Sequence, residues 1–505
     1  MDVLEVHGDP LTPVGGLCCD SRQVEAGDLF VAVRGGRYDG HRFIREAVRR
    51  RACGVVVESL PKGGMPPVFV RVSDSRKALA KLSINFFGYD SRRFQLIGVT
   101  GTNGKTTTTL LIESILRQCG YSVGVLGTLA YRWANREMKA PMTTPESLDL
   151  HRLFHAMQED GVSHVVMEVS SHALALGRVE GCLFDAAVFT NLSQDHLDFH
   201  SDMEAYFKAK ALLFKDCLRS AGSACRAVIN LDDPYGERLL QEIGRPAWTY
   251  SFSRDDARVL VNRADLTPVG ALVEISTPLG NMDIRSPLLG RLNVYNMLAA
   301  ATTALAFDVS AEAIVRGLEG VSQVDGRLQR VPVPQELGYQ VVVDYAHTPD
   351  AMEKSLGCLR EMNEGRLLVV FGCGGDRDRG KRPMMGRVAA KLADLVIVTS
   401  DNPRTEVPGE IIKGIEPGLR DNGLQPFDVF PPESGRRGYA IEVDRKRAIQ
   451  LALSWARAGD LVFIGGKGHE TYQIVGDRVH PFDDRVVVRE YVDSLDQQPG
   501  SCATG

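Results

Sequence analysis

The sequence predicts an α/β protein of three domains. At 505 residues the chain is too long for one hydrophobic core, and at the usual domain size it should divide into about three. Apolar, strand-like runs alternate with helix-like segments, which is typical of mainly parallel sheets. A glycine-rich turn followed by Gly-Lys-Thr lies between one such strand and a helix, so the central domain is predicted to be a P-loop ATPase.

The first two domains are predicted from their strand and joint sequences. The small N-terminal α/β domain, 1–93, contains "GDLFVAVRGGRYDGHRFIREAVRRRACGVVVES", which indicates strand, loop, helix and strand, and ends at the polar joint "GYDSRRF". The central domain, 94–330, starts at the strand "FQLIGVT" and continues with "HVVMEVS" and "FDAAVFTNLS". Prolines and glycines in "VDGRLQRVPVPQELG" break the pattern and end it.

The C-terminal domain, 331–495, repeats the strand-then-helix order of a Rossmann-like fold. Its four apolar strands lie in "QVVVDYAHTPD", "RLLVVFGCGGDRD", "DLVIVTSDNPRTE" and "DLVFIGGKGHETY", and each ends in glycines and polar residues. Ligands of open α/β sheets bind beyond the carboxyl ends of strands, so we expect these four ends to meet at one site. The tail 496–505, "DQQPGSCATG" with its neighbours, is predicted to be disordered.

Composition excludes several classes of function. The 59 basic and 64 acidic residues give a net charge of −5 with no basic block, which argues against nucleic acid and favours small anionic substrates. The ten cysteines show no C-x-x-C pair, so we expect free thiols in a reducing compartment. The start resembles no signal peptide and no run is long enough for a membrane span, which predicts a cytoplasmic protein without membrane insertion. We expect a monomer.

The phosphate loop departs from the common G-x-x-x-x-G-K-[ST] pattern, because Val99 stands where the first glycine belongs. The mechanism is still available: glycines let backbone N–H groups surround phosphate oxygens, Lys105 neutralises charge, and Thr106 can hold Mg²⁺. The alternative is a tight turn with an exposed lysine, which leaves the Gly-Lys-Thr-Thr run unexplained. The residues predicted to contact ATP here are Gly101, Thr102, Asn103, Gly104, Lys105 and Thr106.

Four further side chains have both a functional and an ordinary interpretation. Glu168 follows a strand and is a suitable oxygen ligand for Mg²⁺, although a salt-bridged glutamate fits equally well. His196 is more ordinary as a hydrogen-bonded structural residue, and Lys210, in the helical "YFKAKALLF", should point to solvent. Asn296 can present an amide to adenine, while Asn293 is the better candidate for a helix cap.

An ordered series of motifs covers nearly the whole chain: "TGTNGKTTT", "MEVSSHAL", "TNLSQDHLDFH", "YFKAKALLF", "NVYNMLAA", "DYAHTPDAM" and "SDNPRTE". Together they resemble the Mur ligase family, ATP-dependent amide-forming enzymes of peptidoglycan assembly. The resemblance implies three domains that bind, in order, a UDP-linked muramoyl dipeptide, ATP with Mg²⁺, and an amino acid. It also implies an acyl-phosphate intermediate, formed when ATP activates the dipeptide's carboxylate.

The same resemblance implies roles for individual residues. Glu168 and His196 would carry metal, and Lys210 would be carbamylated and help to position a second Mg²⁺. The residues implied for catalysis are Lys105, Glu168, His196, Lys210 and His347, and Arg327, Asp344 and His347 resemble those that close over ATP. The uridine end would meet Ser21, Gly36, Arg37 and Tyr38, and the dipeptide would meet Thr143, Thr144, Ser170 and Arg178. Met142 stands where relatives often have asparagine, so one polar contact there is in doubt.

The added amino acid is predicted to be meso-diaminopimelate. Its far end carries a carboxylate beside the ammonium, whereas lysine carries only the ammonium, so an arginine should be present to bind the extra anion. "DNPR", the form found in diaminopimelate-adding members, supplies Asp401, Asn402 and Arg404, and "GCGGDRD" supplies Arg377. Glu470 offers a partner for the ammonium, and Gly466 allows close backbone approach.

Several alternatives remain open at the level of sequence. Arg404 could form a surface salt bridge, and the added amino acid could be lysine. A folylpolyglutamate synthase would share the ATP loop, although the N-terminal segment and "DNPR" argue against it. From a different class, the chain could be a nucleotide-driven switch that hydrolyses ATP without forming a bond, or a kinase.

Overall fold

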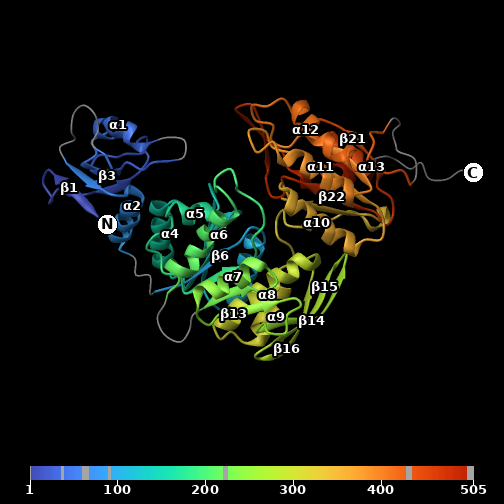
Figure 1. Cartoon of the computed structure of the whole chain (residues 1–505), viewed down its shortest axis with the longest axis horizontal. Coiled ribbons are helices and arrows are strands. Elements are labelled where there is room, and N and C mark those ends of the chain that lie inside the picture. Colours follow the sequence, from blue (N-terminus) through green and yellow to red (C-terminus); the bar gives the residue numbers. More distant parts are fainter. Residues whose placement is uncertain are drawn as a thin grey trace, which may run out of the picture. The chain divides into compact units, whose positions relative to one another are not determined.

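The computed structural model describes residues 2–35, 39–59, 68–88, 93–219, 226–427 and 435–496 (Figure 1). The predicted α/β class is confirmed, since each of the three predicted domains contains its own mainly parallel sheet. Contacts between Cα atoms group the chain into two compact units. The first unit consists of Met1–Leu192, Phe199–Tyr250 and Thr302–Val309, and the second of Ser193–Asp198, Ser251–Ala301 and Ser310–Gly505.

The N-terminal sheet of the first unit has strand order β1-β5-β4-β3-β2, with β1 antiparallel to β5 and the other pairs parallel. Alternating apolar residues bury both faces, one beneath α1 and the other beneath α2. Leu148 of the central domain joins the second of these cores. The elements are β1 (Val3–His7), β2 (Gly16–Cys18), β3 (Asp28–Val31), η1 (Gly40–Phe43), α1 (Ile44–Arg49), β4 (Gly54–Val57), β5 (Phe69–Val72) and α2 (Ser75–Phe87).

The central sheet within the first unit runs β13-β12-β11-β6-β10-β7-β8-β9. Its strands from β13 to β7 are parallel, and β8 and β9 continue as antiparallel strands. The strands are β6 (Gln95–Thr100), β7 (Val123–Leu126), β8 (Ala130–Trp133), β9 (Arg136–Lys139), β10 (His164–Glu168), β11 (Ala186–Phe189), β12 (Ala227–Asn230) and β13 (Trp248–Ser251). The helices are α3 (Lys105–Gln118), α4 (Ser147–Glu159), α5 (Ser171–Ala175), α6 (Met203–Leu212), the π-helical η2 (Leu213–Cys217) and α7 (Pro234–Ile243).

The second unit contains an antiparallel meander and the C-terminal sheet. The meander is followed by two helices: β14 (Val259–Thr267), β15 (Gly270–Thr277), β16 (Gly280–Ser286), α8 (Gly290–Ala306) and α9 (Ala311–Glu319). The C-terminal sheet has order β17-β18-β22-β19-β20-β21, with β17 antiparallel and the rest parallel. Its strands are β17 (Gln329–Val331), β18 (Gln340–Asp344), β19 (Leu367–Phe371), β20 (Leu395–Val398), β21 (Gly438–Ile441) and β22 (Leu461–Gly465).

Helices cover both faces of the C-terminal sheet, as the Rossmann-like prediction requires. One apolar core joins the sheet to α10, α11 and α12, and the other joins it to α13 and α14. The remaining elements are η3 (Gln335–Leu337), α10 (Pro349–Met362), α11 (Lys381–Leu392), α12 (Pro408–Arg420), α13 (Arg445–Trp455), the hairpin β23 (Tyr472–Val475) and β24 (Arg478–Pro481), and α14 (Asp484–Asp496). The four predicted strands β18, β22, β19 and β20 are adjacent, so their carboxyl ends lie along one edge.

Two predictions from composition can be compared with the described residues. The eight cysteines in this part of the chain are free thiols, as expected, while Cys225, Cys502 and the predicted disordered tail from 497 onward lie outside it. Among the described helices, none has the length and apolar character needed to cross a membrane.

Candidate active site

The phosphate loop, residues 101–106, joins β6 to the start of α3, as predicted. Gly101 has φ +146°, and a Cβ there would lie 1.9 Å from the Thr190 hydroxyl, so no other residue fits. Gly104 has φ +85° and occupies the N-cap of α3, where no side chain caps the helix. The first N–H groups of a 14-residue helix therefore face the loop without a side-chain acceptor at the cap, which suits an anion.

Hydrogen bonds hold the phosphate loop in shape. The Lys105 ammonium donates to the carbonyls of Gly101 and Thr102, both at 2.9 Å, so this lysine is folded over the loop and only partly exposed. Asn191 binds the Asn103 main chain twice, accepting from its N–H at 3.0 Å and donating to its carbonyl at 3.1 Å. The alternative of a simple turn with an exposed lysine does not fit this arrangement.

Lys210 is buried, which contradicts the expectation that it points to solvent. Only 1% of the residue is exposed, and its ammonium donates to the Gly101 carbonyl at 2.8 Å. The same ammonium lies 4.6 Å from the ring centre of Tyr206, whose hydroxyl is 3.1 Å from that of Thr102. Helix α6 therefore brings a second lysine to the phosphate loop. The apolar sequence around Lys210 gave no indication of this arrangement.

Glu168 is buried at the carboxyl end of β10, next to β6. Its oxygens accept from the Thr128 N–H at 2.8 Å and from the Thr128 hydroxyl at 3.1 Å. Gly127 makes room for the carboxylate, since a Cβ at 127 would lie 2.5 Å from it. Sequence reasoning missed Thr128, although its place just after strand β7 on the same sheet edge was a usable signal.

The two segments predicted to bind the dipeptide are adjacent in the first unit. The Thr144 hydroxyl donates to the Glu168 carbonyl at 2.9 Å and accepts from the Ser170 N–H at 3.1 Å. The Arg178 guanidinium pairs with Glu146 at 2.9 Å and also contacts the Thr144 carbonyl. The Thr143 hydroxyl lies 3.1 Å from that of Thr128, which links these segments to Glu168.

The position of Met142 and the predicted uridine end can also be compared with the structure. Arg178 also lies 3.2 Å from the Met142 sulfur, so methionine occupies the position where relatives often have asparagine. At the uridine end Ser21 is buried, while Gly36, Arg37 and Tyr38 lie outside the described residues.

His196 belongs to the 193–198 segment of the second unit, where it has φ +55° and its Nε2 lies 3.4 Å from Asp195.

Helix α8 gives a different account of the two asparagines. Asn293 is no N-cap, because α8 already begins at Gly290 and the Asn293 amide donates back to the Leu289 carbonyl at 2.9 Å. The helix-cap prediction for Asn293 was therefore wrong. The buried Asn296 donates to the Asn293 side-chain oxygen at 3.1 Å, so each of the two amides helps to orient the other.

The segment predicted to close over ATP is tied to the C-terminal sheet. The Asp344 carboxylate accepts from the N–H groups of Leu328 at 2.6 Å and Ala346 at 2.8 Å, and from Ser355. Burial raises the pKa of Asp344, and these hydrogen bonds and the charge of Arg327 act in the opposite direction. The Arg327 guanidinium lies 4.7 Å from the ring centre of Tyr345.

His347 is held as a neutral imidazole. Burial and the nearby Lys381 ammonium lower its pKa, while a contact of 2.8 Å between its Nδ1 and the Tyr345 carbonyl has the opposite effect. Lys381 donates to the His347 carbonyl at 2.8 Å. At neutral pH this histidine is suited to hydrogen bonding rather than to binding an anion by charge.

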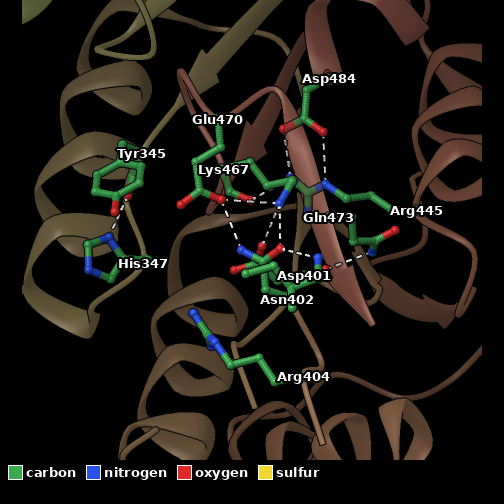
Figure 2. A network of polar contacts seen from close by, with 12 residues as sticks. Tyr345, His347, Asp401, Asn402, Arg404, Arg445, Lys467, Glu470, Gln473 and Asp484 are labelled. Carbon is green, nitrogen blue, oxygen red and sulfur yellow. Dashed lines mark hydrogen bonds and ion pairs between the residues drawn. The ribbon is translucent and has the colours of Figure 1, made fainter. Parts of the chain in front are cut away.

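The residues predicted to bind the amino acid meet at the ends of β20 and β22 (Figure 2). Asn402 donates to Glu470 at 2.9 Å, and Lys467 approaches both of them as well as Asp401. We call Asp401, Asn402, Lys467 and Glu470 the strand-end cluster. Of the four strand ends predicted to meet, those of β20 and β22 are in direct contact here. Lys467 was missed, because a lysine between two glycines resembles an exposed loop residue.

Arg404 and Arg377 lie beside this cluster rather than in it. In Figure 2 no dashed line joins Arg404 to the strand-end cluster, and its guanidinium donates to the Gly375 carbonyl at 2.7 Å. Its hydrogen bond to a carbonyl argues against the surface salt bridge considered from the sequence, while Arg377 is exposed. Gly466 has a φ of +113°, which favours glycine, and a Cβ there would meet Asp401 at an ordinary 3.5 Å.

The described residues contain no group of three or more His, Cys, Asp or Glu side chains arranged to hold a metal by themselves. Magnesium fits nonetheless, because it keeps several waters and is usually bound by one or two carboxylates together with substrate phosphates. Glu168 and Thr106 are both buried and lie at the carboxyl edge of neighbouring strands. They would supply one carboxylate and one hydroxyl to a magnesium ion bound in this way.

Comparison with known proteins gives a consistent result over the whole chain. Three family models match: "Mur ligase family, catalytic domain" at residues 13–87, "Mur ligase middle domain" at 99–304, and "Mur ligase, glutamate ligase domain" at 326–468. Two relatives are named UDP-N-acetylmuramoyl-L-alanyl-D-glutamate–2,6-diaminopimelate ligase. The protein from Geobacter metallireducens is 46% identical over 95% of this chain and 94% of its own length. The one from Gloeobacter violaceus is 48% identical over 96% and 95%.

A solved structure of a ligase with the same name is 33% identical, covers 96% of each chain and has a TM-score of 0.67.

Proposed function

The chain belongs to the Mur ligase family, and from this membership we propose that it joins meso-diaminopimelate to UDP-N-acetylmuramoyl-L-alanyl-D-glutamate at the expense of ATP. The observation that carries the proposal is full-length similarity, at 46–48% identity, to relatives named for this reaction. The structure adds support, because residues of the "DNPR" segment and Glu470 lie together at one sheet edge.

The reaction begins with activation of the dipeptide's carboxylate, which is a poor acyl donor. ATP, when bound, supplies the phosphoryl group that converts this carboxylate to an acyl phosphate, and Mg²⁺ offsets charge on the phosphates. In our proposal the phosphate loop orients the triphosphate through its backbone N–H groups, and Lys105 leaves the Gly101 and Thr102 carbonyls to bind phosphate oxygens. Glu168 and Thr106 hold the metal.

Lys210 has a separate role in the proposal. Its buried ammonium contacts the Gly101 carbonyl, so a change of charge at Lys210 would act directly on the phosphate loop. Carbamylation, as in the family, would make it an anion that helps to position a second Mg²⁺. His196 and His347 are assigned to the metal and to the nucleotide on the same basis, as are Asn296, Arg327 and Asp344.

Activation leaves ADP, and the amine of the amino acid then attacks the acyl phosphate, so that the amide bond forms as the bond to phosphate breaks and inorganic phosphate leaves. We assign its far ammonium to Glu470 and its far carboxylate to Arg404, with Asn402, Asp401, Gly466 and Arg377 completing the site. The muramoyl dipeptide is assigned to Thr143, Thr144, Ser170 and Arg178, and the uridine end to Ser21 and residues 36–38. A cytoplasmic monomer with domain boundaries at 93 and 330 belongs to the same proposal.

The test is a product assay with purified protein, ATP, Mg²⁺ and UDP-N-acetylmuramoyl-L-alanyl-D-glutamate. Meso-diaminopimelate and lysine are supplied in parallel, and both phosphate release and product mass are measured. Phosphate release with the tripeptide product only in the presence of diaminopimelate supports the proposal. Turnover with lysine alone would reassign the amino acid, whereas ATP hydrolysis that is indifferent to both amino acids would favour a nucleotide-driven switch.

A further inference from the structure

Lys467 is the centre of the strand-end cluster, although no part of it reaches the surface. Its exposed fraction is 0%, and its ammonium lies 3.4 Å from an Asp401 oxygen, 3.0 Å from the Asn402 side-chain oxygen and 3.2 Å from Glu470 Oε2 (Figure 2). All three neighbours belong to the proposed amino-acid site. A fully buried lysine cannot contact the substrate itself, so any effect it has on binding must act through these neighbours.

The first effect of Lys467 is on orientation. The Asn402 oxygen accepts from the Lys467 ammonium and from the Ile474 N–H at 3.0 Å, which directs its amide nitrogen to Glu470. Lys467 and Asn402 both donate to the same carboxylate oxygen, Oε2 of Glu470. Figure 2 shows the second carboxylate oxygen pointing away from Lys467, where it is available to a ligand's ammonium.

The second effect is on charge. Two carboxylates and one ammonium give the cluster a net charge of −2 + 1 = −1. The neighbouring Arg445 and Asp484 are both completely buried, are paired at 2.8 Å and cancel one another, and Arg445 anchors the end of β22 through the Gly465 carbonyl. Without Lys467 the cluster would carry −2, which would repel a carboxylate on the incoming amino acid and still attract its ammonium.

We propose that Lys467 is a positioning residue that makes the strand-end cluster selective for an amino acid whose far end carries both an ammonium and a carboxylate. It does so by holding Glu470 and Asn402 in a binding orientation and by neutralising one of two adjacent carboxylates. This inference rests on the proposed function and deepens it. It adds to the ligand-contacting residues a buried one that controls discrimination between diaminopimelate and lysine.

The experiment compares wild-type protein with Lys467→Met, which keeps an unbranched side chain one atom shorter than lysine and removes its charge. Lys446→Met is the matched control, because Lys446 lies in the same unit in an exposed pair with Glu490. KM is measured for meso-diaminopimelate, lysine and ATP, and thermal unfolding is followed for each protein. In Lys467→Met we expect the KM for diaminopimelate to rise by about tenfold or more, with the KM for ATP changed less than about twofold.

The ratio of kcat/KM for diaminopimelate to that for lysine should fall by about tenfold in the same variant, and Lys446→Met should match wild type. A general loss of structure would instead raise every KM together. Lys467→Gln, which can still donate hydrogen bonds, is the second variant and should show the same loss of discrimination with a smaller rise in KM.

Each outcome decides the question. An unchanged KM and ratio in Lys467→Met, or parallel changes in the KM values for diaminopimelate and ATP, would overturn the assignment. If neither variant folds, the lysine supports the domain rather than positioning the site, and the assignment also fails. Failure of the proposed function is separate, because it would appear as absence of the tripeptide product in the wild-type protein.

Discussion

The phosphate loop and the strand-end cluster both contain buried or partly buried lysines, but the two lysine environments differ. At the phosphate loop, Lys105 and Lys210 both donate to the neutral carbonyl of Gly101, at 2.9 and 2.8 Å. In the strand-end cluster, Lys467 lies among two carboxylates and an amide. Transfer of a lysine from a carbonyl to a phosphate exchanges a neutral acceptor for an anionic one, whereas a lysine between carboxylates is already held by opposite charges. One arrangement suits transient binding of an anion and the other permanent organisation of a site.

The largest effect that this comparison predicts is for Lys105→Ala. Removing a cation that stabilises developing charge should lower kcat/KM by about 10³-fold, or ~4 kcal/mol of transition-state stabilisation, with little change in thermal unfolding. Steady-state phosphate release measures the effect. Lys208→Ala, an exposed lysine on α6, is the control. Activity within about tenfold of wild type would remove Lys105 from phosphate binding.

Lys210→Ala should have the next largest effect, a fall in kcat/KM of about 10²-fold. Its side chain reaches the same carbonyl as Lys105, so the substitution removes a contact to Gly101 together with the group that we assign to the second Mg²⁺. Lys208→Ala, two residues earlier on α6, is again the matched control. A lower melting temperature with normal kcat/KM would assign Lys210 to stability alone and break the comparison between the two sites.

Arg404→Ala tests the other side of the comparison. Loss of a bidentate partner for the far carboxylate should raise the KM for diaminopimelate about 30-fold, or ~2 kcal/mol, and leave the KM for ATP nearly unchanged. Arg420→Ala, whose side chain pairs with Glu416 on the surface of α12, is the control. Equal increases in both KM values would remove Arg404 from the specificity site.

The smallest predicted effect is on the pH dependence of stability, and it comes from two buried histidines, one in each unit. Burial lowers the pKa of His151 to about 4 and that of His469 to about 3, so both are neutral in the folded protein near pH 7. The unfolded chain binds a proton near pH 6.5, so the free energy of unfolding should fall as pH decreases from there towards 4.

At pH 5 the loss from His151 should reach about 1–2 kcal/mol. Denaturant unfolding at pH 7 and pH 5 measures it, and His151→Leu should show a smaller difference between the two pH values. An equal difference in both proteins would mean that His151 does not titrate as its burial implies.

Much of the fold follows from local pattern. The strands β6, β10, β18, β19, β20 and β22 were predicted because each is an apolar run ended by glycines or polar residues, and a parallel sheet then places their ends on one edge. The same reasoning brought Asp401, Asn402 and Glu470 together. Short edge elements such as β17 and β21 give too weak a pattern to be assigned in this way.

The parts that could not be predicted depend on tertiary burial. Lys210 lies in an apolar helix and Lys467 between glycines, and in both cases the local sequence favours an exposed lysine; only packing against distant segments buries them. Asn293 was misassigned because α8 begins at Gly290, four residues earlier than an N-cap at Asn293 requires. The residue roles that the family resemblance implies stay predictions until the variants above are measured.

The anchoring of the segment around Arg327 has a consequence for the timing of the reaction. A Cβ at Gly326 would lie 2.2 Å from the His469 nitrogen, and Asp344 binds Leu328, so Arg327 is fixed between two contacts to the C-terminal sheet. Arg327 and Glu470 are therefore both held to the C-terminal sheet. With the roles proposed for them above, the nucleotide and the amino acid would be engaged from one domain, and their engagement would be observed as a single kinetic step rather than two.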